Sequence, residues 1–373
     1  MRLLIVAGEA SGDLHAANLL TALRTVAPEL EAFGVGGARL REAGLACLAH
    51  SEELSVMGLA EVVRELPRLL VLARRVRREA LARRPDAAVL VDSPDFNLPL
   101  ARHLRRAGIP VVVYISPQLW AWREGRVRRI RRDVAKVLCI LPFEVGFYEQ
   151  HGVPVEFVGH PLVDELAPVM VAPPARSAHA VALLPGSRWH EVTALLPTML
   201  QAAGRLDVPT GAVHLRLIAA PGLERERLAA LLGDAAATIE VVSENRHHVL
   251  AECGAALVAS GTATLECALL GVPMVVGYRL HVLSYALARY LVHVPYVSLV
   301  NLVAGKRVVP ELVQDEFTPE RVAVELRSLL AGGGEAQGPG LTEVRERLGA
   351  PGASARAARA VLAMLDARQS PKK

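Results

Sequence analysis

The sequence predicts an α/β protein built from two doubly wound, Rossmann-like domains that face each other across a cleft. Its 373 residues exceed what one hydrophobic core usually organises, since domains hold about 150 residues each. In both halves, short runs rich in Val, Ile and Leu alternate with segments of helical periodicity, which is typical of parallel strands joined by helices. Near the middle of the chain, glycine and prolines interrupt this alternation.

Each half supplies five candidate strands. Those of the first half are residues 3–7, 87–91, 110–115, 136–141 and 155–158. Those of the second half are residues 178–184, 213–219, 239–242, 255–259 and 274–277. In doubly wound sheets ligands bind beyond the carboxyl ends of the strands. Each turn from a strand into a helix is therefore a candidate part of the functional site.

The interruption predicts the domain boundary. Residues 159–174 contain Gly159 and four prolines, and they separate the last strand of the first half from the first strand of the second. We therefore expect an amino-terminal domain over residues 1–165 and a carboxy-terminal domain over residues 175–350.

Three expectations concern the end of the chain. Residues 331–340 hold five glycines and one proline and are expected to form a loop. Residues 353–368 are expected to form a final helix that packs back toward the amino-terminal domain. The polar tail over residues 369–373 is expected to be disordered.

Composition excludes several classes of protein. Hydrophobic residues make up 52% of the chain and charged residues 21%, which excludes a disordered chain. No apolar run approaches the ~18 to 20 residues that a membrane-spanning helix needs. The apolar run at residues 3–7 is too short for a signal peptide, so we expect a cytoplasmic protein. The four cysteines show no CxxC spacing, which predicts buried thiols without disulfides or zinc.

Positive charge is concentrated in the first half of the chain. Residues 1–160 hold 22 Lys and Arg against 18 Asp and Glu, whereas residues 161–373 hold 20 of each. Two segments, residues 61–84 and 118–136, each carry a net charge of +5. We expect an anionic partner to approach this half.

The first basic segment has the pattern of an amphipathic helix. Apolar residues recur at helical spacing from Leu59 to Ala80, arginines lie between them, and Pro67 is expected to start a second helix. Such an element suits the surface of an anionic membrane. The alternative is an ordinary crossover helix with a solvated face.

Two turns of the second half are suited to binding phosphate. Residues 178–184 lead into Gly186, Ser187 and Arg188, where backbone amides and a guanidinium can bind phosphate oxygens. The alternative is a routine turn with a surface arginine.

The second such turn begins a helix. Residues 255–259 lead into Ser260, Gly261 and Thr262, where the helix amino terminus favours a diphosphate. Glu266, one turn further on, is within reach of ribose hydroxyls. The alternative is that Ser260 caps the helix and Glu266 complements its dipole. The two turns together favour a nucleotide site.

The first half has two polar motifs at strand ends, residues 8–13 and 92–97. No GxGxxG spacing is present. Residues 34–37 begin such a motif, but its last position, residue 39, is not glycine, so a nicotinamide cofactor is not favoured. The chain has no DxD or HExxH motif for a metal. Asp92 or Asp95 is a candidate general base; the alternative is that both cap the following helix, which we favour for Asp92.

A third motif contains two of the three tryptophans of the chain. Residues 114–123 follow a predicted strand and include Trp120 and Trp122. Such clustering fits either a binding role or packing between domains, and the sequence does not separate the two.

In order along the chain, five motifs resemble those of the lipid-A-disaccharide synthase family: residues 8–13, 92–97, 116–123, 184–188 and 260–266. The resemblance extends from about residue 3 to residue 330. It implies the two-domain glycosyltransferase B fold and an inverting, metal-independent transfer without a cofactor. The implied donor is UDP-2,3-diacylglucosamine and the implied acceptor is 2,3-diacylglucosamine 1-phosphate (lipid X). The products are the β-1,6-linked lipid A disaccharide 1-phosphate and UDP.

The resemblance also assigns roles to residues. Asp95 stands at the position of the family's proposed base, and Glu266 matches the glutamate that holds the ribose in related glycosyltransferases of this fold. Arg188 and the amides of residues 260–262 are expected to stabilise the leaving diphosphate. The remaining implied positions form a donor group, Gly186, Ser187, Asn301 and Gln314, and an acceptor group, Glu9, Ser11, Asp13, Ser116, Trp120, Trp122 and Arg123.

The family context further implies peripheral association with the inner face of the inner membrane and apolar cover for the acyl chains. We expect residues 56–84 to contact the anionic membrane surface or the acyl chains. No nucleic acid partner is expected. The rival hypotheses are a peptidoglycan-precursor transferase or a UDP-sugar 2-epimerase of the same fold, and a non-catalytic lipid-binding protein.

Overall fold

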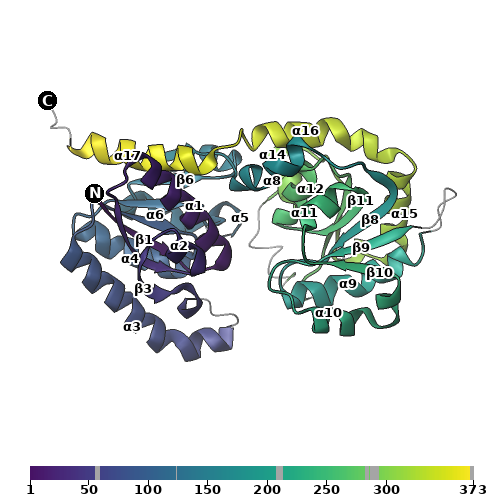
Figure 1. Cartoon of the computed structure of the whole chain (residues 1–373), viewed down its shortest axis with the longest axis horizontal. Helices are drawn as coiled ribbons and strands as arrows, with labels where there is room; N and C mark the ends of the chain where they lie inside the picture. The colour runs from purple at the N-terminus through teal and green to yellow at the C-terminus, as the bar shows by residue number, and fades with distance from the viewer. Residues whose placement is uncertain (55–58, 123, 207–212, 282–284, 286–293, 370–373) are drawn as a thin grey trace. The chain divides into compact units, whose positions relative to one another are not determined.

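The structure is a computed structural model that describes residues 1–54, 59–122, 124–206, 213–281, 285 and 294–369. Its contacts divide the chain into two compact units. Unit 1 comprises Met1–Pro161 together with Ala350–Lys373, and unit 2 comprises Leu162–Gly349. Each unit is an α/β domain around a parallel sheet (Figure 1).

Unit 1 contains a sheet of seven parallel strands in the order β3-β2-β1-β4-β5-β6-β7. The strands β1, β4 and β5 at its centre are buried almost throughout, because helices cover both faces of a parallel sheet. The strand bounds are β1 (Arg2–Ala7), β2 (Glu31–Gly36), β3 (Ala46–His50), β4 (Ala87–Val91), β5 (Val111–Tyr114), β6 (Lys136–Cys139) and β7 (Val155–Phe157).

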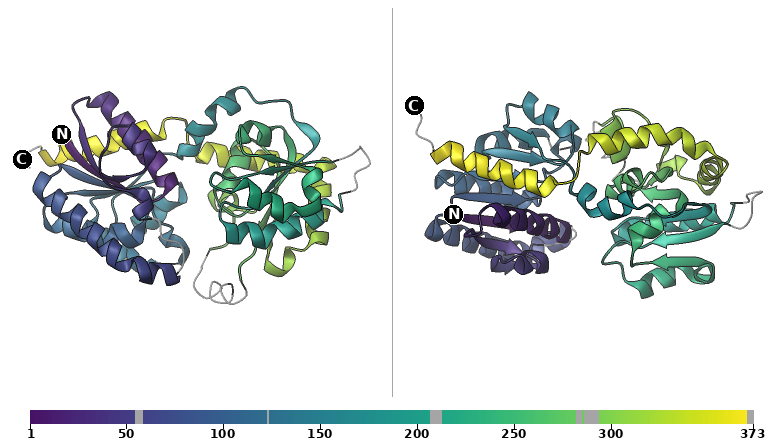
Figure 2. Two further views of the ribbon diagram at one scale, coloured as in Figure 1. Left: turned by 60° about the horizontal axis from the view of Figure 1, so that its bottom comes forward. Right: turned by 45° about the horizontal axis from the view of Figure 1, so that its top comes forward.

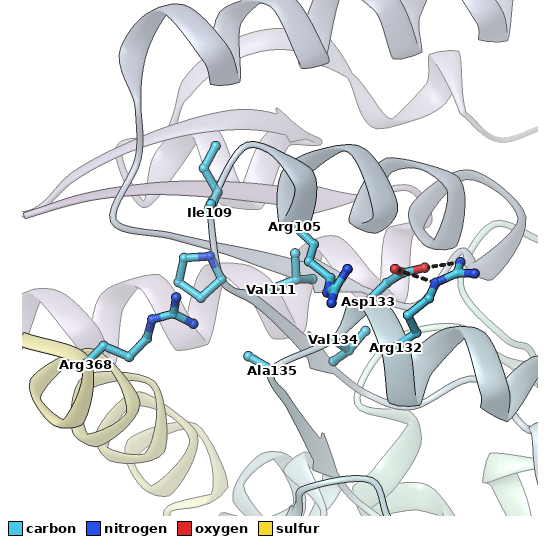
Figure 3. Close-up of a pocket in the computed structure, with 10 residues that line it drawn as sticks. Arg105, Ile109, Val111, Arg132, Asp133, Val134, Ala135 and Arg368 are labelled. Carbon is cyan, nitrogen blue, oxygen red and sulfur yellow. Dashed lines mark hydrogen bonds and ion pairs between the residues drawn. The ribbon is translucent and has the colours of Figure 1, made fainter. Parts of the chain in front are cut away.

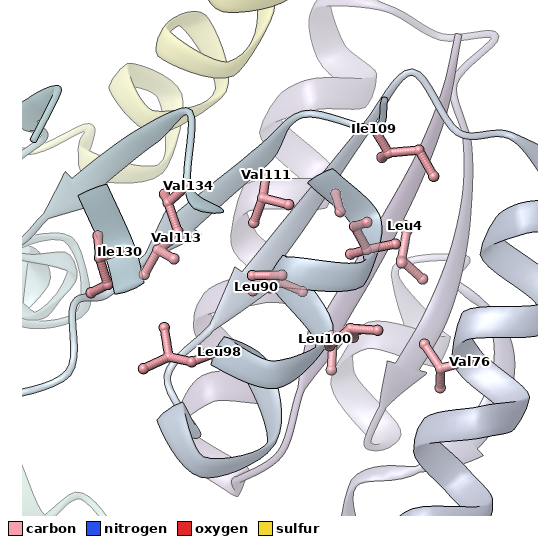
Figure 4. Packing of buried hydrophobic residues seen from close by; sticks show 14 of the residues in the cluster. Leu4, Val76, Leu90, Leu98, Leu100, Ile109, Val111, Val113, Ile130 and Val134 are labelled. Carbon is pink, nitrogen blue, oxygen red and sulfur yellow. The ribbon is translucent and has the colours of Figure 1, made fainter. Parts of the chain in front are cut away.

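Helices form a layer on each face of this sheet. Alternate residues of β1 point to opposite faces, with Leu4 packed against one layer and Ile5 against the other. The first layer contains α3 (Leu59–Arg83), α4 (Pro94–Arg106) and α6 (Val127–Asp133), whose apolar side chains fill the core in Figure 4.

The second layer contains α1 (Ala10–Val26) and α17 (Ala353–Gln369), which lie side by side (Figure 2). Arg356 of α17 donates to the carbonyl oxygen of Val158 at 2.8 Å. The shorter helices of unit 1 are α2 (Ala38–Glu42), η1 (Ser51–Glu53), α5 (Leu119–Trp122), η2 (Glu124–Arg126) and α7 (Phe143–Gln150).

Unit 2 contains a sheet of six parallel strands in the order β10-β9-β8-β11-β12-β13. They are β8 (Ser177–Leu184), β9 (His214–Ile218), β10 (Ile239–Val242), β11 (Cys253–Ala259), β12 (Met274–Tyr278) and β13 (Glu311–Val313). The helices are α8 (Pro161–Val171), α9 (Trp189–Ala203), α10 (Arg225–Leu232), η3 (Gly233–Ala237), α11 (Arg246–Ala251), α12 (Thr262–Leu269), α14 (Leu299–Ala304), η4 (Gln314–Glu316), α15 (Pro319–Leu330), η5 (Gly333–Gln337) and α16 (Gly338–Arg347).

All ten predicted strands are confirmed, with bounds that differ by at most two residues. The sequence reading missed β2, β3 and β13. β2 contains Gly34 and Gly36, which weaken a strand pattern. Gly34 has φ +151°, and a Cβ there would overlap the carbonyl oxygen of Ile5 on the neighbouring strand. Gly34 thus allows β2 to pack closely against β1.

Two local predictions were wrong. Pro67 lies inside α3, so a single helix continues through it. Residues 331–340 form η5 and the start of α16, with Pro339 in the first turn, where a missing amide costs little. The interval 159–174, in which the chain passes from unit 1 to unit 2, also contains α8, which begins at Pro161.

The predicted final helix is confirmed as α17, and residues 370–373 of the predicted disordered tail lie outside the described residues. In the described part of the chain, no helix combines the length and the apolar character needed to cross a bilayer.

Candidate functional site

Four neighbouring strands of unit 1 end at one edge of the sheet. The register pairs Ala7 with Val91, Val91 with Tyr114, and Tyr114 with Leu138. Because these strands are parallel, the segments that follow them start side by side. The structure therefore brings together three of the polar motifs that the sequence singled out, residues 8–13, 92–97 and 116–123.

The segment that carries Asp95 is strained and firmly held. Asp92 and Ser93 both have left-handed backbones, with φ of 49° and 43°, which is costly for residues other than glycine. The buried Asn97 stabilises this bend, because its Nδ2 donates to the carbonyl oxygens of Val91 at 3.2 Å and Asp92 at 2.7 Å. Such strain at a strand end is typical of functional sites.

The two motifs at this edge pack directly on each other. A Cβ atom on Gly8 would meet Oγ of Ser93, which would have to move aside, so the glycine keeps this contact close. Ser93 is the N-cap of α4 and makes no side-chain capping bond. Ser93 thus stands at the N-cap position of α4, one residue after Asp92 and two before Asp95.

Asp95 lies in the first turn of α4, and its side chain is 77% exposed. Oδ1 of Asp95 accepts a hydrogen bond from Nη2 of Arg126 at 2.7 Å. Arg126 closes η2, and its side chain is only 24% exposed. Arg126 belongs to the basic segment of residues 118–136, but no spacing rule connects it with a residue 31 positions away.

Of the proposed acceptor residues in the first motif, Asp13 has a role inside the fold. Its buried carboxylate accepts from the amides of Gly37 at 2.6 Å, Arg39 at 3.0 Å and Leu40 at 3.3 Å, and so it caps α2. Glu9 and Ser11 are exposed. Of the motif's side chains that the structure describes, those of Glu9 and Ser11 therefore face solvent at this edge.

Ser116 and Trp120 are held by a buried polar network. Ser116 bonds to the hydroxyl of Tyr148, and Nε1 of the partly exposed Trp120 donates to Oε1 of Glu144 at 3.2 Å. The ring of Trp120 also contacts the edge of Phe143, with centroids 4.8 Å apart.

Glu144 is 1% exposed, and burial raises its pKa to about 8. It also accepts from the amide of Leu141 at 3.2 Å. The side chain of Trp122 and the whole of Arg123 lie outside the described residues.

In unit 2 the turn after β8 differs from the expectation. The amides of Ser187 and Arg188 both donate to Oε2 of Glu191, at 3.1 and 3.3 Å. Glu191 therefore occupies the donors that the sequence assigned to phosphate, and it also packs against Gly186. The Arg188 side chain is 55% exposed, with Nη1 3.9 Å from Glu191, and it remains available to a ligand.

The turn after the neighbouring strand β11 leaves donors open. The Ser260 amide donates to the carbonyl oxygen of Gly277 at 3.1 Å, and its hydroxyl to that of Val297 at 2.7 Å, so Ser260 does not cap α12. The N-cap is Gly261, with φ +149°, no side-chain capping bond, and no atom within 4 Å of where a Cβ would lie. Among the described residues, the amides of Gly261 and Thr262 have no acceptor.

Glu266 lies at the centre of a charged cluster on α12, α11 and α8. Both of its oxygens accept from Arg246 at 3.2 Å, and Nε2 of His247 lies 3.7 Å from Oε2. Burial alone would raise the pKa of Glu266, but His247 and Arg246 outweigh it and lower the pKa. Oε1 of Glu165 lies 3.8 Å from Nη2 of Arg246 and 3.8 Å from Nε2 of His247. Neither Arg246 nor His247 was predicted from the sequence.

Asn301 and Gln314 do not present open groups on the donor side. Asn301 is fully buried; its Oδ1 accepts from the amides of Val308 and Val309, and its Nδ2 donates to Glu311 at 2.8 Å. Gln314 exchanges two hydrogen bonds with the backbone of Leu280. Both side chains hold loops beside β12 and β13 in place.

A cavity of about 160 Å³ lies at the opposite edge of the unit 1 sheet, at the amino ends of β5 and β6 (Figure 3). Arg105, Arg132 and Arg368 line it, and hydrogen bonds from Arg132 hold the pKa of Asp133 below its usual range. None of the residues assigned to the donor group, the acceptor group or the base lies there. Among the described residues, no group of three His, Cys, Asp or Glu side chains is placed to hold a metal ion.

Comparison with known proteins identifies a family. The family model described as lipid-A-disaccharide synthetase matches residues 3–359. The chain is 50% identical over 376 residues to the lipid-A-disaccharide synthase of Anaeromyxobacter dehalogenans strain 2CP-C, covering 98% of this chain and 97% of that protein. It is 46% identical to that of Myxococcus xanthus over 373 residues, with the same coverage.

Solved structures share the fold at low sequence identity. A Staphylococcus aureus MnaA–UDP complex has a TM-score of 0.67 at 12% identity and covers 100% of this chain and 99% of that one. The glycosyltransferase of kitacinnamycin has a TM-score of 0.65 at 17% identity, covering 97% of this chain and 98% of that one. The calicheamicin glycosyltransferase has a TM-score of 0.63 at 18% identity, with 99% of both chains covered. These structures are glycosyltransferase B neighbours, which confirms the predicted fold class.

The buried carboxyl group of Glu144 makes the stability of unit 1 depend on pH. Its pKa is about 8 in the folded chain and 4.5 ordinarily, so between these values the folded state binds more protons than the unfolded state. The contribution of Glu144 to stability therefore falls as pH rises through this window. We expect the free energy of unfolding of Glu144→Gln minus that of the parent chain to increase by a few kcal/mol between pH 5 and pH 8. Thermal unfolding of both chains at pH 5, 6.5 and 8 measures this, and a difference that stays constant with pH would contradict the assignment.

Proposed function

The chain belongs to the lipid-A-disaccharide synthase family, and from this premise we propose that it transfers 2,3-diacylglucosamine from UDP to 2,3-diacylglucosamine 1-phosphate. The family is one of glycosyltransferases, and the chain matches it over nearly its whole length. That match is the observation that carries the proposal. The products are the β-1,6-linked disaccharide 1-phosphate and UDP.

We propose that Asp95 is the general base. The 6-hydroxyl of the acceptor attacks C1 of the donor sugar while Asp95 takes its proton, and the bond from C1 to the diphosphate breaks. Attack from the face opposite the leaving group inverts the configuration at C1. The exposure of the Asp95 carboxylate, the strained segment before it and its contact with Arg126 support this role.

The departing UDP is proposed to bind at the carboxyl edge of the sheet of unit 2. The open amides of Gly261 and Thr262, together with the dipole of α12, are suited to a diphosphate, and Arg188 adds a guanidinium. These groups stabilise the negative charge that develops on the leaving group without a metal ion. Glu266 keeps lone pairs for ribose hydroxyls beyond those engaged by Arg246, which fixes the carboxylate in place.

We further propose that unit 1 docks on the cytoplasmic face of the inner membrane through the helix layer α3, α4 and α6. α3 carries seven arginines and three glutamates, α4 three arginines and one aspartate, and α6 four arginines and one aspartate. On α3, the apolar side chains of Leu70, Val71 and Leu81 are 48 to 60% exposed. Exposed apolar groups among arginines fit an anionic lipid surface and the acyl chains of the substrates.

Replacing the proposed base should abolish turnover and leave nucleotide binding intact. We expect Asp95→Asn to lower the rate of disaccharide formation by about a hundredfold to ten-thousandfold, the range of general base catalysis, with unchanged UDP affinity. Radiolabelled product formation and titration calorimetry measure the two quantities. Asp92→Asn is the matched control, because asparagine tolerates the left-handed backbone there. A fully active Asp95→Asn variant would exclude this base.

Removing the exposed guanidinium near β8 should weaken UDP binding. We expect Arg188→Ala to raise the dissociation constant for UDP several-fold or more, because it removes a charge-assisted contact to phosphate. Calorimetric titration with UDP tests this. Arg225→Ala, on an exposed side chain of α10, is the control, and equal affinity of Arg188→Ala and the parent chain would remove Arg188 from the site.

Reversing charge on α3 should prevent membrane binding. We expect the variant Arg74→Glu, Arg75→Glu, Arg77→Glu, Arg78→Glu to remain folded but no longer to sediment together with phosphatidylglycerol vesicles. The control variant is Arg39→Glu, Arg225→Glu, Arg321→Glu, Arg359→Glu, at exposed positions outside α3. It has the same change in net charge and should still sediment with the vesicles. Equal partitioning of both variants would contradict docking through α3.

A further inference from the structure

Arg126 has hydrogen-bonding capacity beyond its contact with Asp95. A guanidinium carries five N–H donors, and Nη2 of Arg126 donates to Asp95 at 2.7 Å. Within the described residues, no other hydrogen bond is found for the Arg126 side chain. The side chain is 24% exposed, so part of this group faces solvent next to a carboxylate that is 77% exposed.

The backbone beneath Arg126 is well anchored. Arg126 is the N-cap of α6, and Val127 and Ile130 of that helix are buried in the core of unit 1. The guanidinium therefore projects from a fixed base toward the carboxyl edge of the sheet. Arg128 and Arg129, exposed on the same helix, add positive charge that favours the approach of a dianion.

We propose that Arg126 binds the phosphate of the acceptor with its remaining donors while it holds Asp95, and so places the acceptor hydroxyl at the base. The inference rests on the proposed function, because it takes the acceptor to be a sugar 1-phosphate. It makes Arg126 the residue that selects a phosphorylated acceptor.

The chemistry of the acceptor fits a single guanidinium. In a pyranose, C1 and C5 flank the ring oxygen, so the phosphate on C1 and the hydroxyl on C6 lie at the same end of the sugar. A guanidinium is planar and can bind one anion along each of two edges. With Asp95 on one edge and the phosphate on the other, the 6-hydroxyl is directed toward the carboxylate.

Recognition of the phosphate is thereby coupled to removal of the proton from the 6-hydroxyl. When Arg126 holds both groups, the 6-hydroxyl lies at the carboxylate of Asp95, and its proton ends on Asp95 as the oxygen attacks C1 of the donor.

The test compares two acceptors that differ in one group. The parent chain, Arg126→Gln and Arg126→Lys are assayed in detergent micelles with 2,3-diacylglucosamine 1-phosphate and with the same sugar carrying a hydroxyl on C1. We expect the parent chain to prefer the phosphorylated acceptor by about tenfold to a hundredfold in kcat/KM, the value of a charge-assisted contact. Arg126→Gln should reduce this preference to near one, and Arg126→Lys should retain part of it.

Arg359→Gln, on an exposed position of α17, is the matched control and should keep the preference of the parent chain. If Arg126→Gln slows both acceptors by the same factor, Arg126 only positions Asp95 and the proposal is overturned, while the proposed function stands. If the parent chain forms no disaccharide from either acceptor, the proposed function fails and this inference fails with it.

Discussion

Burial of both faces of a parallel sheet is the constraint on which the rest of the structure depends. In each unit the central strands are almost entirely apolar and are covered by helices, so most polar side chains lie at or beyond the strand ends. At the carboxyl ends the strands lead into helix amino termini, where free amides favour anions. The candidate base in unit 1 and the candidate diphosphate site in unit 2 both follow from this placement.

The same edge needs polar side chains to hold its own loops together. Asp13 caps α2, Asn97 binds the carbonyl groups of a strained bend, and Asn301 connects α14 with the start of β13. Each of these side chains is buried and engaged by the backbone or by a neighbouring side chain. The side chains of Asp95 and Arg188 are instead exposed, and in the described part of the chain the amides of Gly261 and Thr262 have no acceptor. Exposure to solvent therefore distinguishes candidate binding residues from loop-holding residues as much as residue type does.

This division explains what the sequence could and could not predict. Hydrophobic periodicity located ten of the thirteen strands that the described residues form, because a buried parallel strand is a continuous apolar run. It missed β2, where glycines make close packing possible, and two edge strands. The motifs located the ends of the strands. They did not distinguish side chains that hold loops in place from groups that are exposed to a ligand. Asp13, Ser260 and Asn301 were grouped with the ligand-binding residues, although their partners are internal.

Contacts between distant segments lay beyond sequence reasoning. Arg126 reaches Asp95 from 31 positions away, and Arg246 reaches Glu266 from 20. No periodicity connects such pairs, since the topology alone brings them together. The measurement that tests the account most directly is a crystal structure of the chain with UDP, grown with a chelator present. The account predicts the diphosphate at the amides of Gly261 and Thr262, with Arg188 beside it. A diphosphate bound elsewhere, or UDP binding that requires a divalent ion, would contradict it.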